Sequence, residues 1–178
     1  MPDASSVSNQ ANTRGVPVVR SISWPATIPQ LATLSLAVTV GWLLTRSVQG
    51  VFFGSMAYLI YSYASRLLLA RYHRQGVRRS RAGQFREAIP LHQQSYEFFS
   101  RHTWLDRYRA ITMMSPSAMS YREMALINIA FAHSQLGDGK TAKAYYERAL
   151  QEFPQSGMAR AALRFIHSVE NSNAESLL

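Results

Sequence analysis

The chain has 178 residues and no cysteine, which excludes disulfides, thiolate chemistry and cysteine-based zinc sites. Its apolar share of 47% is ordinary for a globular protein, so composition alone assigns no class. The net charge of +9 is unevenly placed, because residues 1–81 carry nine arginines and only Asp3 as an acid, whereas residues 82–178 carry ten basic and nine acidic residues. This asymmetry predicts a basic N-terminal arm and a balanced, soluble-looking C-terminal domain.

The N-terminal half contains two long apolar blocks. Residues 1–27 are rich in Ser, Asn, Pro and Ala without an apolar period, which is typical of a disordered tail. The blocks follow at residues 28–45 and 51–70, with Arg46 between them. As helices they would be roughly 27 to 30 Å long, close to the hydrocarbon thickness of a bilayer. We therefore predict a two-helix transmembrane hairpin over residues 28–70.

The flanks of the two blocks predict how this hairpin is oriented. The connection RSVQG is short, so both ends of the hairpin would lie on one side of the membrane. Most of the arginines flank those ends and only Arg46 lies in the turn, which places both termini in the cytoplasm by the positive-inside rule. Small residues recur every fourth position and would allow close helix contact in lipid; they are Thr33, Ala37, Gly41 and Thr45 in the first block, and Gly50 and Gly54 in the second.

The same apolar blocks are also compatible with three other interpretations. The stretch LSLAVTVGW alternates large and small residues, which is strand periodicity, although no second strand of matching pattern is visible. Two buried helices of a soluble protein would have the same composition. A signal peptide or an organellar transit peptide is a further alternative, since the N-terminus is basic and poor in acids.

An arginine-rich segment follows the second block. If it is helical, Arg71, Arg74, Arg78 and Arg81 fall within an arc of roughly 80°. We expect this stripe to contact lipid phosphates at the cytoplasmic surface. The alternative is a soluble helical protein whose basic arm, residues 66–81, binds nucleic acid, but no known nucleic-acid-binding pattern accompanies the arginines.

Residues 123–156 form a 34-residue unit with two apolar helical periods around Gly137. Ser120 and Glu123 form a capping box for its first helix, and Asp138 can cap its second. The unit resembles a tetratricopeptide repeat. The positions of that pattern are filled by Leu126, Ile129, Ala130, His133, Ala142, Tyr146, Ala149 and Pro154.

A degraded copy of the same pattern lies upstream. Residues 83–99 match the turn and second helix of a repeat, and the arginine-rich segment would be its first helix, with Gly76 in the small slot. An insertion over residues 100–119 separates the copies, and residues 156–169 look like a closing helix. The resemblance implies an all-α chain in which a short tetratricopeptide-like solenoid, residues 71–170, follows the hairpin and a loose tail, residues 171–178, ends the chain.

The resemblance also implies a peptide-binding groove. Its positions here are Met124, Ile127, Asn128, Phe131 and Gln135. The basic residues with which some relatives bind a terminal carboxylate are replaced by His73, Val77 and Ala162, so an apolar or helical peptide suits the groove better than an acidic tail. Packing of the same residues under the insertion or the closing helix is the alternative.

The sequence contains no recognisable signature of catalysis or of metal binding. The run GDGKT, residues 137–141, lacks the first glycine and the preceding strand of a phosphate-binding loop, and the five histidines show no metal-ligand spacing. We therefore expect no catalytic residue, no metal and no cofactor. The sequence predicts a membrane-anchored adaptor or assembly protein that binds a protein partner or itself through its repeat face and contacts membrane lipids, with nucleic acid an unlikely partner.

Overall fold

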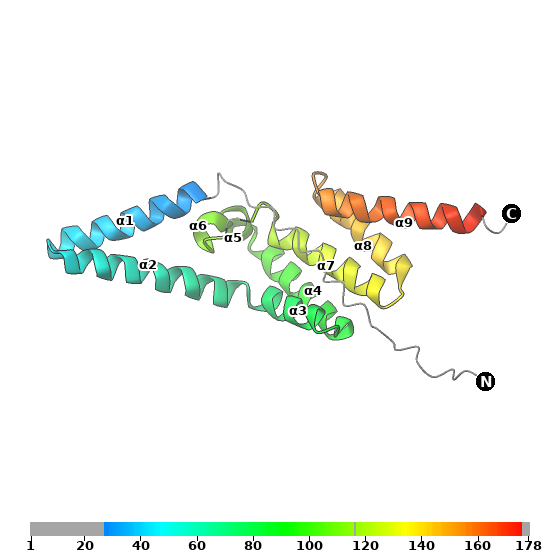
Figure 1. The fold of residues 1–178 in the computed structure, drawn as a ribbon, viewed down its shortest axis with the longest axis horizontal. Coiled ribbons are helices and arrows are strands. Elements are labelled where there is room, and N and C mark those ends of the chain that lie inside the picture. The colour runs from blue at the N-terminus through cyan, green and yellow to red at the C-terminus, as the bar shows by residue number, and fades with distance from the viewer. Residues whose placement is uncertain (1–26, 116, 176–178) are drawn as a thin grey trace, which may run out of the picture.

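A computed structural model describes residues 27–115 and 117–175, and this part of the chain is all-helical, without strands. The tail predicted for residues 1–27 lies outside it, except for Thr27, which begins the first helix. Nine helices follow one another in Figure 1: α1 (Thr27–Thr45), α2 (Val48–Leu69), α3 (Arg71–Arg81), α4 (Phe85–Arg101), α5 (Thr103–Arg107), α6 (Arg109–Thr112), α7 (Tyr121–Gln135), α8 (Gly139–Glu152) and α9 (Gly157–Glu175).

Helices α1 and α2 pack antiparallel and project from one end of the molecule (Figure 1). The strand suggested by alternation in LSLAVTVGW is wrong, because α1 is continuous through it. The predicted small-residue contact is confirmed: a Cβ at Gly41 would overlap the carbonyl of Gly50, and one at Gly54 would overlap the carbonyl of Ala37. Glycine at these positions therefore lets the two backbones touch directly.

The remaining helices pack in succession, α3 on α4, α4 on α7, α7 on α8 and α8 on α9. Two of these pairs turn through a glycine with positive φ, Gly83 at 74° and Gly137 at 79°, a conformation that favours glycine. Ala88, Ala130 and Ala149 are fully buried, which allows close helix crossings. Helix α9 continues to Glu175, beyond the end expected for the closing helix, so the start of the predicted loose tail is helical.

The predicted caps of α7 and α8 are present. The Ser120 hydroxyl accepts a hydrogen bond from the Glu123 amide at 3.1 Å, and the Asp138 carboxylate accepts one from the Thr141 amide at 3.1 Å. The insertion adds a second cap that was not predicted from the sequence. The buried carboxylate of Asp106 in α5 accepts hydrogen bonds from the amides of Tyr121 and Arg122. The first turn of α7 is thus held by side chains from two segments.

The insertion also joins the hairpin to the helical domain. Near the C-terminal end of α2, the Tyr61 hydroxyl lies 3.3 Å from the carbonyl of Ile111, and the Arg66 guanidinium donates to the carbonyls of Met113 and Met114. Met113 and Met114 are fully buried, and Met113 packs in a cluster with Ala70, Phe99, Leu105 and Tyr121. The base of the hairpin is therefore fastened to the domain by polar and apolar contacts together.

Candidate membrane interface and protein-binding face

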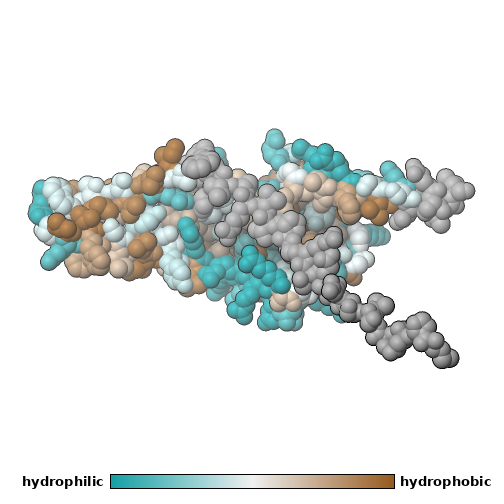
Figure 2. All heavy atoms as spheres, viewed as in Figure 1, coloured by the Kyte–Doolittle hydropathy of each residue, from teal (hydrophilic) through white to brown (hydrophobic). Residues whose placement is uncertain are grey.

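The hairpin exposes apolar side chains on all sides. Helix α1 has no buried residue, and α2 buries only Gly50, Gly54 and Ser65. Figure 2 shows hydrophobic residues spread over this end of the molecule. Large apolar side chains are exposed along both helices, among them Ile28, Leu31, Leu36, Val40, Leu44, Val51, Phe52, Phe53, Leu59, Ile60 and Leu68.

Among the described helices, α1 alone is long and apolar enough to cross a membrane by length and composition. Its 19 residues have a mean hydropathy of 1.5 over the best window, and none of that window is buried. A signal sequence passes the same test, and α1 lies near the N-terminus. Helix α2 does not meet the criterion although it has 22 residues, since Gln49, Arg66 and its tyrosines lower its hydropathy. The sequence predicted that both apolar blocks span the membrane. Among the described helices, only α1 has the hydropathy of a candidate span.

The four arginines of the predicted stripe are all exposed on α3. Arg71 bonds to the hydroxyl of its neighbour Tyr72 at 2.8 Å, and no acidic partner of Arg74, Arg78 or Arg81 occurs within the described ranges. Arg79 differs, because it pairs with Glu87 at 2.9 Å. Figure 2 shows hydrophilic residues gathered beside the apolar hairpin. The stripe thus leaves positive charge available at the base of the hairpin.

The five predicted groove residues do not share one exposed surface. Ile127 is 6% exposed and belongs to the core cluster with Leu126, Ala130 and Tyr146. Met124 is partly buried against the cluster that contains Met113 and Phe99. This agrees with the alternative prediction that Met124 packs under the insertion. The half-buried Phe131 has its ring 5.9 Å from that of Phe85, Asn128 is half-buried, and Gln135 is exposed. Of the five residues, Asn128, Phe131 and Gln135 thus keep accessible surface, and Ile127 is buried.

Two histidines whose proximity the sequence did not predict lie together between α3, α4 and α7. The rings of His73 and His92 are 6.2 Å apart, and the ring of His73 stands edge-on to Tyr121 at 5.1 Å. His92 is fully buried, with its Nε2 3.2 Å from the Ser80 hydroxyl, and Gly76 lies so close that a Cβ there would come within 2.7 Å of the His92 ring. The Nδ1 atoms of both histidines have no hydrogen-bond partner.

Burial lowers the pKa of His73 from 6.5 to about 4. Burial, together with the charge that His73 would carry, lowers the pKa of His92 to about 3. Both rings are therefore neutral at pH 7. No group of three metal-ligating side chains gathers anywhere in residues 27–115 and 117–175, so nothing there extends the pair into a metal site.

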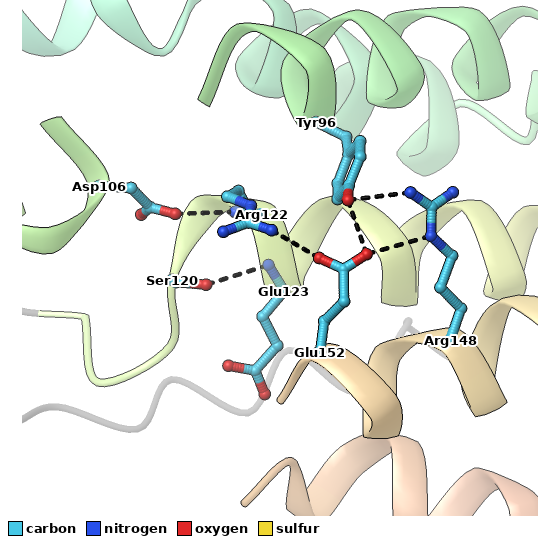
Figure 3. Close-up of polar contacts among 7 residues, drawn as sticks. All are labelled: Tyr96, Asp106, Ser120, Arg122, Glu123, Arg148 and Glu152. Atoms are coloured by element: carbon cyan, nitrogen blue, oxygen red, sulfur yellow. Dashed lines mark hydrogen bonds and ion pairs between the residues drawn. The ribbon is translucent and has the colours of Figure 1, made fainter. Parts of the chain in front are cut away.

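A polar network joins α4, α7 and α8 (Figure 3). The carboxylate of Glu152 accepts hydrogen bonds from the Tyr96 hydroxyl at 2.6 Å, from Arg122 at 2.6 Å and from Arg148 at 3.1 Å. Arg148 also donates to the Tyr96 hydroxyl at 2.9 Å. Burial alone would raise the pKa of Glu152, but the hydrogen bonds from Tyr96 and Arg148 and the charges of Arg122 and Arg148 outweigh burial and lower it.

Replacing Glu152 with Ala is expected to reduce the free energy of unfolding by about 1–2 kcal/mol, because Tyr96 and Arg122 lose a charged acceptor in a partly buried place. The matched control is Glu147→Ala on the same helix, since Glu147 is exposed and should change stability by less than about 0.5 kcal/mol. Chemical denaturation followed by circular dichroism measures both. Equal effects of the two substitutions would show that the network contributes nothing beyond surface charge.

Comparison with protein-family models, with curated proteins and with solved structures finds no match to this chain.

Proposed function

We propose that this protein is a membrane-anchored adaptor of the tetratricopeptide-repeat type, whose α1–α2 hairpin inserts into a bilayer and whose helical domain binds a protein partner on the cytoplasmic side. The observation that carries the proposal is the exposure of large apolar side chains around the whole hairpin. Continuous apolar surfaces of this extent mark membrane or protein interaction sites in soluble and anchored proteins alike.

Lipid is the occupant that suits this surface. Helix α1 is about 28 Å long at about 1.5 Å per residue, which matches the hydrocarbon core. At the tip of the hairpin Arg46 lies over the Trp42 ring at 5.5 Å, and this pair suits a headgroup region. At the opposite end the exposed arginines of α3 would reach the headgroups of the cytoplasmic leaflet.

The repeat-like arrangement supports the adaptor part of the proposal. The pairs α3–α4 and α7–α8 each turn at a glycine with positive φ, and α9 packs on α8 where the first helix of a further repeat would lie. Phe165 and Val169 of α9 are exposed, so this end of the stack is not closed by an apolar partner within the described chain. We therefore expect the protein to self-associate or to bind a protein partner at this open end of the helical stack.

The anchor is tested by substitutions whose effect depends on the solvent around α1. Leu36 and Val40 lie one turn apart and are 64% and 44% exposed, so arginine at both positions should hardly disturb a fold surrounded by water. In a bilayer each arginine would cost about 2.5–3.5 kcal/mol. The wild type should pellet with membranes and resist alkaline carbonate, whereas the Leu36→Arg, Val40→Arg variant should be released.

The control for helix propensity and lost apolar area is Leu36→Ala with Val40→Ala, which should stay in the carbonate pellet. Complete release of the wild type by carbonate would refute the anchor. In that case a tight, steeply salt-dependent complex of the soluble protein with RNA or DNA, lost when Arg71, Arg74, Arg78 and Arg81 become Gln, would establish the nucleic-acid alternative instead.

A further inference from the structure

A pocket of about 300 Å³ lies where the hairpin meets the helical domain. Its walls come from the end of α2, the start of α3 and the first residue of α7. The lining residues are Tyr63, Arg66, Ala70, Arg74 and Tyr121. This volume is at the small end of the range for ligand sites and suits a compact group.

The side chains around this pocket are hydrogen-bond donors. Arg66 is held in place by its bonds to the carbonyls of Met113 and Met114, and the guanidinium has further N–H groups beyond those bonds. Arg74 is exposed and has no acidic partner within the described ranges. Tyr63 and Tyr121 add two phenol groups. Ala70 contributes a small side chain to the wall and is itself buried.

No acidic side chain in the described part of the chain forms an ion pair with Arg66 or Arg74. None of the five lining residues is acidic. The nearby carboxylate of Asp106 is 4% exposed and already accepts hydrogen bonds from the amides of Tyr121 and Arg122. Arg66 and Arg74 therefore have no paired carboxylate among the described residues, and unpaired arginines are the groups that bind phosphate well.

We propose that this pocket binds the phosphate group of an anionic phospholipid. The inference rests on the proposed membrane anchor, because Tyr63 and Arg66 directly follow the apolar part of α2 and would then lie at headgroup depth. The acyl chains would extend along the exposed apolar side chains of α2, such as Leu59 and Ile60, while the phosphate lies between Arg66 and Arg74. The pocket thus binds one selected lipid. The other arginines of the stripe contact the lipid headgroups of the leaflet without selection.

Isothermal titration calorimetry of the full chain in a nonionic detergent tests this site. The probes are short-chain phosphatidic acid, short-chain phosphatidylcholine and inorganic phosphate. We expect saturable binding of phosphatidic acid, and Arg74→Gln should weaken it about tenfold. The matched control is Arg78→Gln, which removes the same charge from the same helix outside the pocket and should weaken binding by less than about twofold.

One further variant separates binding in the pocket from general electrostatic attraction. Tyr63→Phe should weaken binding severalfold without changing the charge, and because Tyr63 is 69% exposed the substitution leaves the fold intact. Equal losses in Arg74→Gln and Arg78→Gln, or no saturable binding, would overturn the proposal. Inorganic phosphate binding as tightly as the lipid, with the same dependence on Arg74, would overturn the lipid assignment and leave a site for a soluble phosphate.

The failure of this proposal and the failure of the anchor can be told apart. A protein that is released by carbonate but binds phosphate through Arg74 would contradict the anchor and keep the pocket. A carbonate-resistant protein in which Arg74 and Arg78 are equivalent would keep the anchor and contradict the pocket.

Discussion

Replacing Ile127 with Ser is expected to remove about 3–5 kcal/mol from the free energy of unfolding. Ile127 is 6% exposed and packs with Leu126, Ala130 and Tyr146, so the substitution leaves a cavity and buries a hydroxyl without a partner. This is a large part of the stability of a small domain. Chemical denaturation followed by circular dichroism should show a lower midpoint, and partial unfolding already in buffer.

Phe131→Ser is the contrasting substitution on the same helix. Phe131 is half-buried and meets Phe85 edge-on, so its loss should cost only about 1–2 kcal/mol and leave the helical content intact. If Phe131 lies at the partner surface, the variant should still lose self-association or partner binding, measured by light scattering. A folded Ile127→Ser protein that has lost a complex would contradict the core assignment and restore Ile127 to the groove.

Lowering the pH from 7 to 5 is expected to reduce the free energy of unfolding by about 4 kcal/mol through His73 and His92. Their folded pKa values are about 4 and about 3, below the ordinary 6.5, so the unfolded chain binds more protons than the folded chain below pH 6.5. Stability is therefore complete above about pH 6.5 and falls by about 1.4 kcal/mol per pH unit for each histidine. The loss levels off below about pH 3.

His73→Phe tests the origin of this pH dependence. The ring and its contact with Tyr121 are kept, and the unpartnered Nδ1 of His73 is removed. The loss of stability between pH 7 and pH 5 should then fall to about half, as measured by denaturation at both pH values. His167→Gln is the comparison variant, because His167 is exposed on α9 and lies outside the buried pair, and it should keep most of the acid-induced loss. An unaltered slope in His73→Phe would assign the acid sensitivity to other groups.

Local rules predicted the helices well. The two apolar blocks became α1 and α2 nearly within their expected limits, and the caps at Ser120 and Asp138 formed because each depends on residues three positions apart. The glycines of the hairpin were recognisable for the same reason, since their spacing of four residues places them on one helix face. The alternation that suggested a strand was misleading because apolar residues on every side of α1 carry no periodic signal.

Contacts between distant segments were not predictable. The side chain of Asp106 caps a helix that begins fifteen residues later, and Arg66 bonds to carbonyls nearly fifty residues away. The proposed phosphate pocket combines two arginines of the predicted basic segment with Tyr121, the first residue of the distant helix α7. The burial of Ile127 was not predictable, because a single repeat pattern does not show which neighbouring helix covers each face.

The most direct test of the anchor uses the absence of cysteine from the chain, since any introduced thiol is then the only one. Ser47→Cys places a thiol in the α1–α2 connection, and Ser168→Cys places one on exposed α9. Sealed inside-out membrane vesicles containing either variant are treated with a membrane-impermeant maleimide. The hairpin predicts labelling of Ser168→Cys without detergent and of Ser47→Cys only after detergent opens the vesicles. Equal labelling of both variants in sealed vesicles would contradict a hairpin that crosses the bilayer.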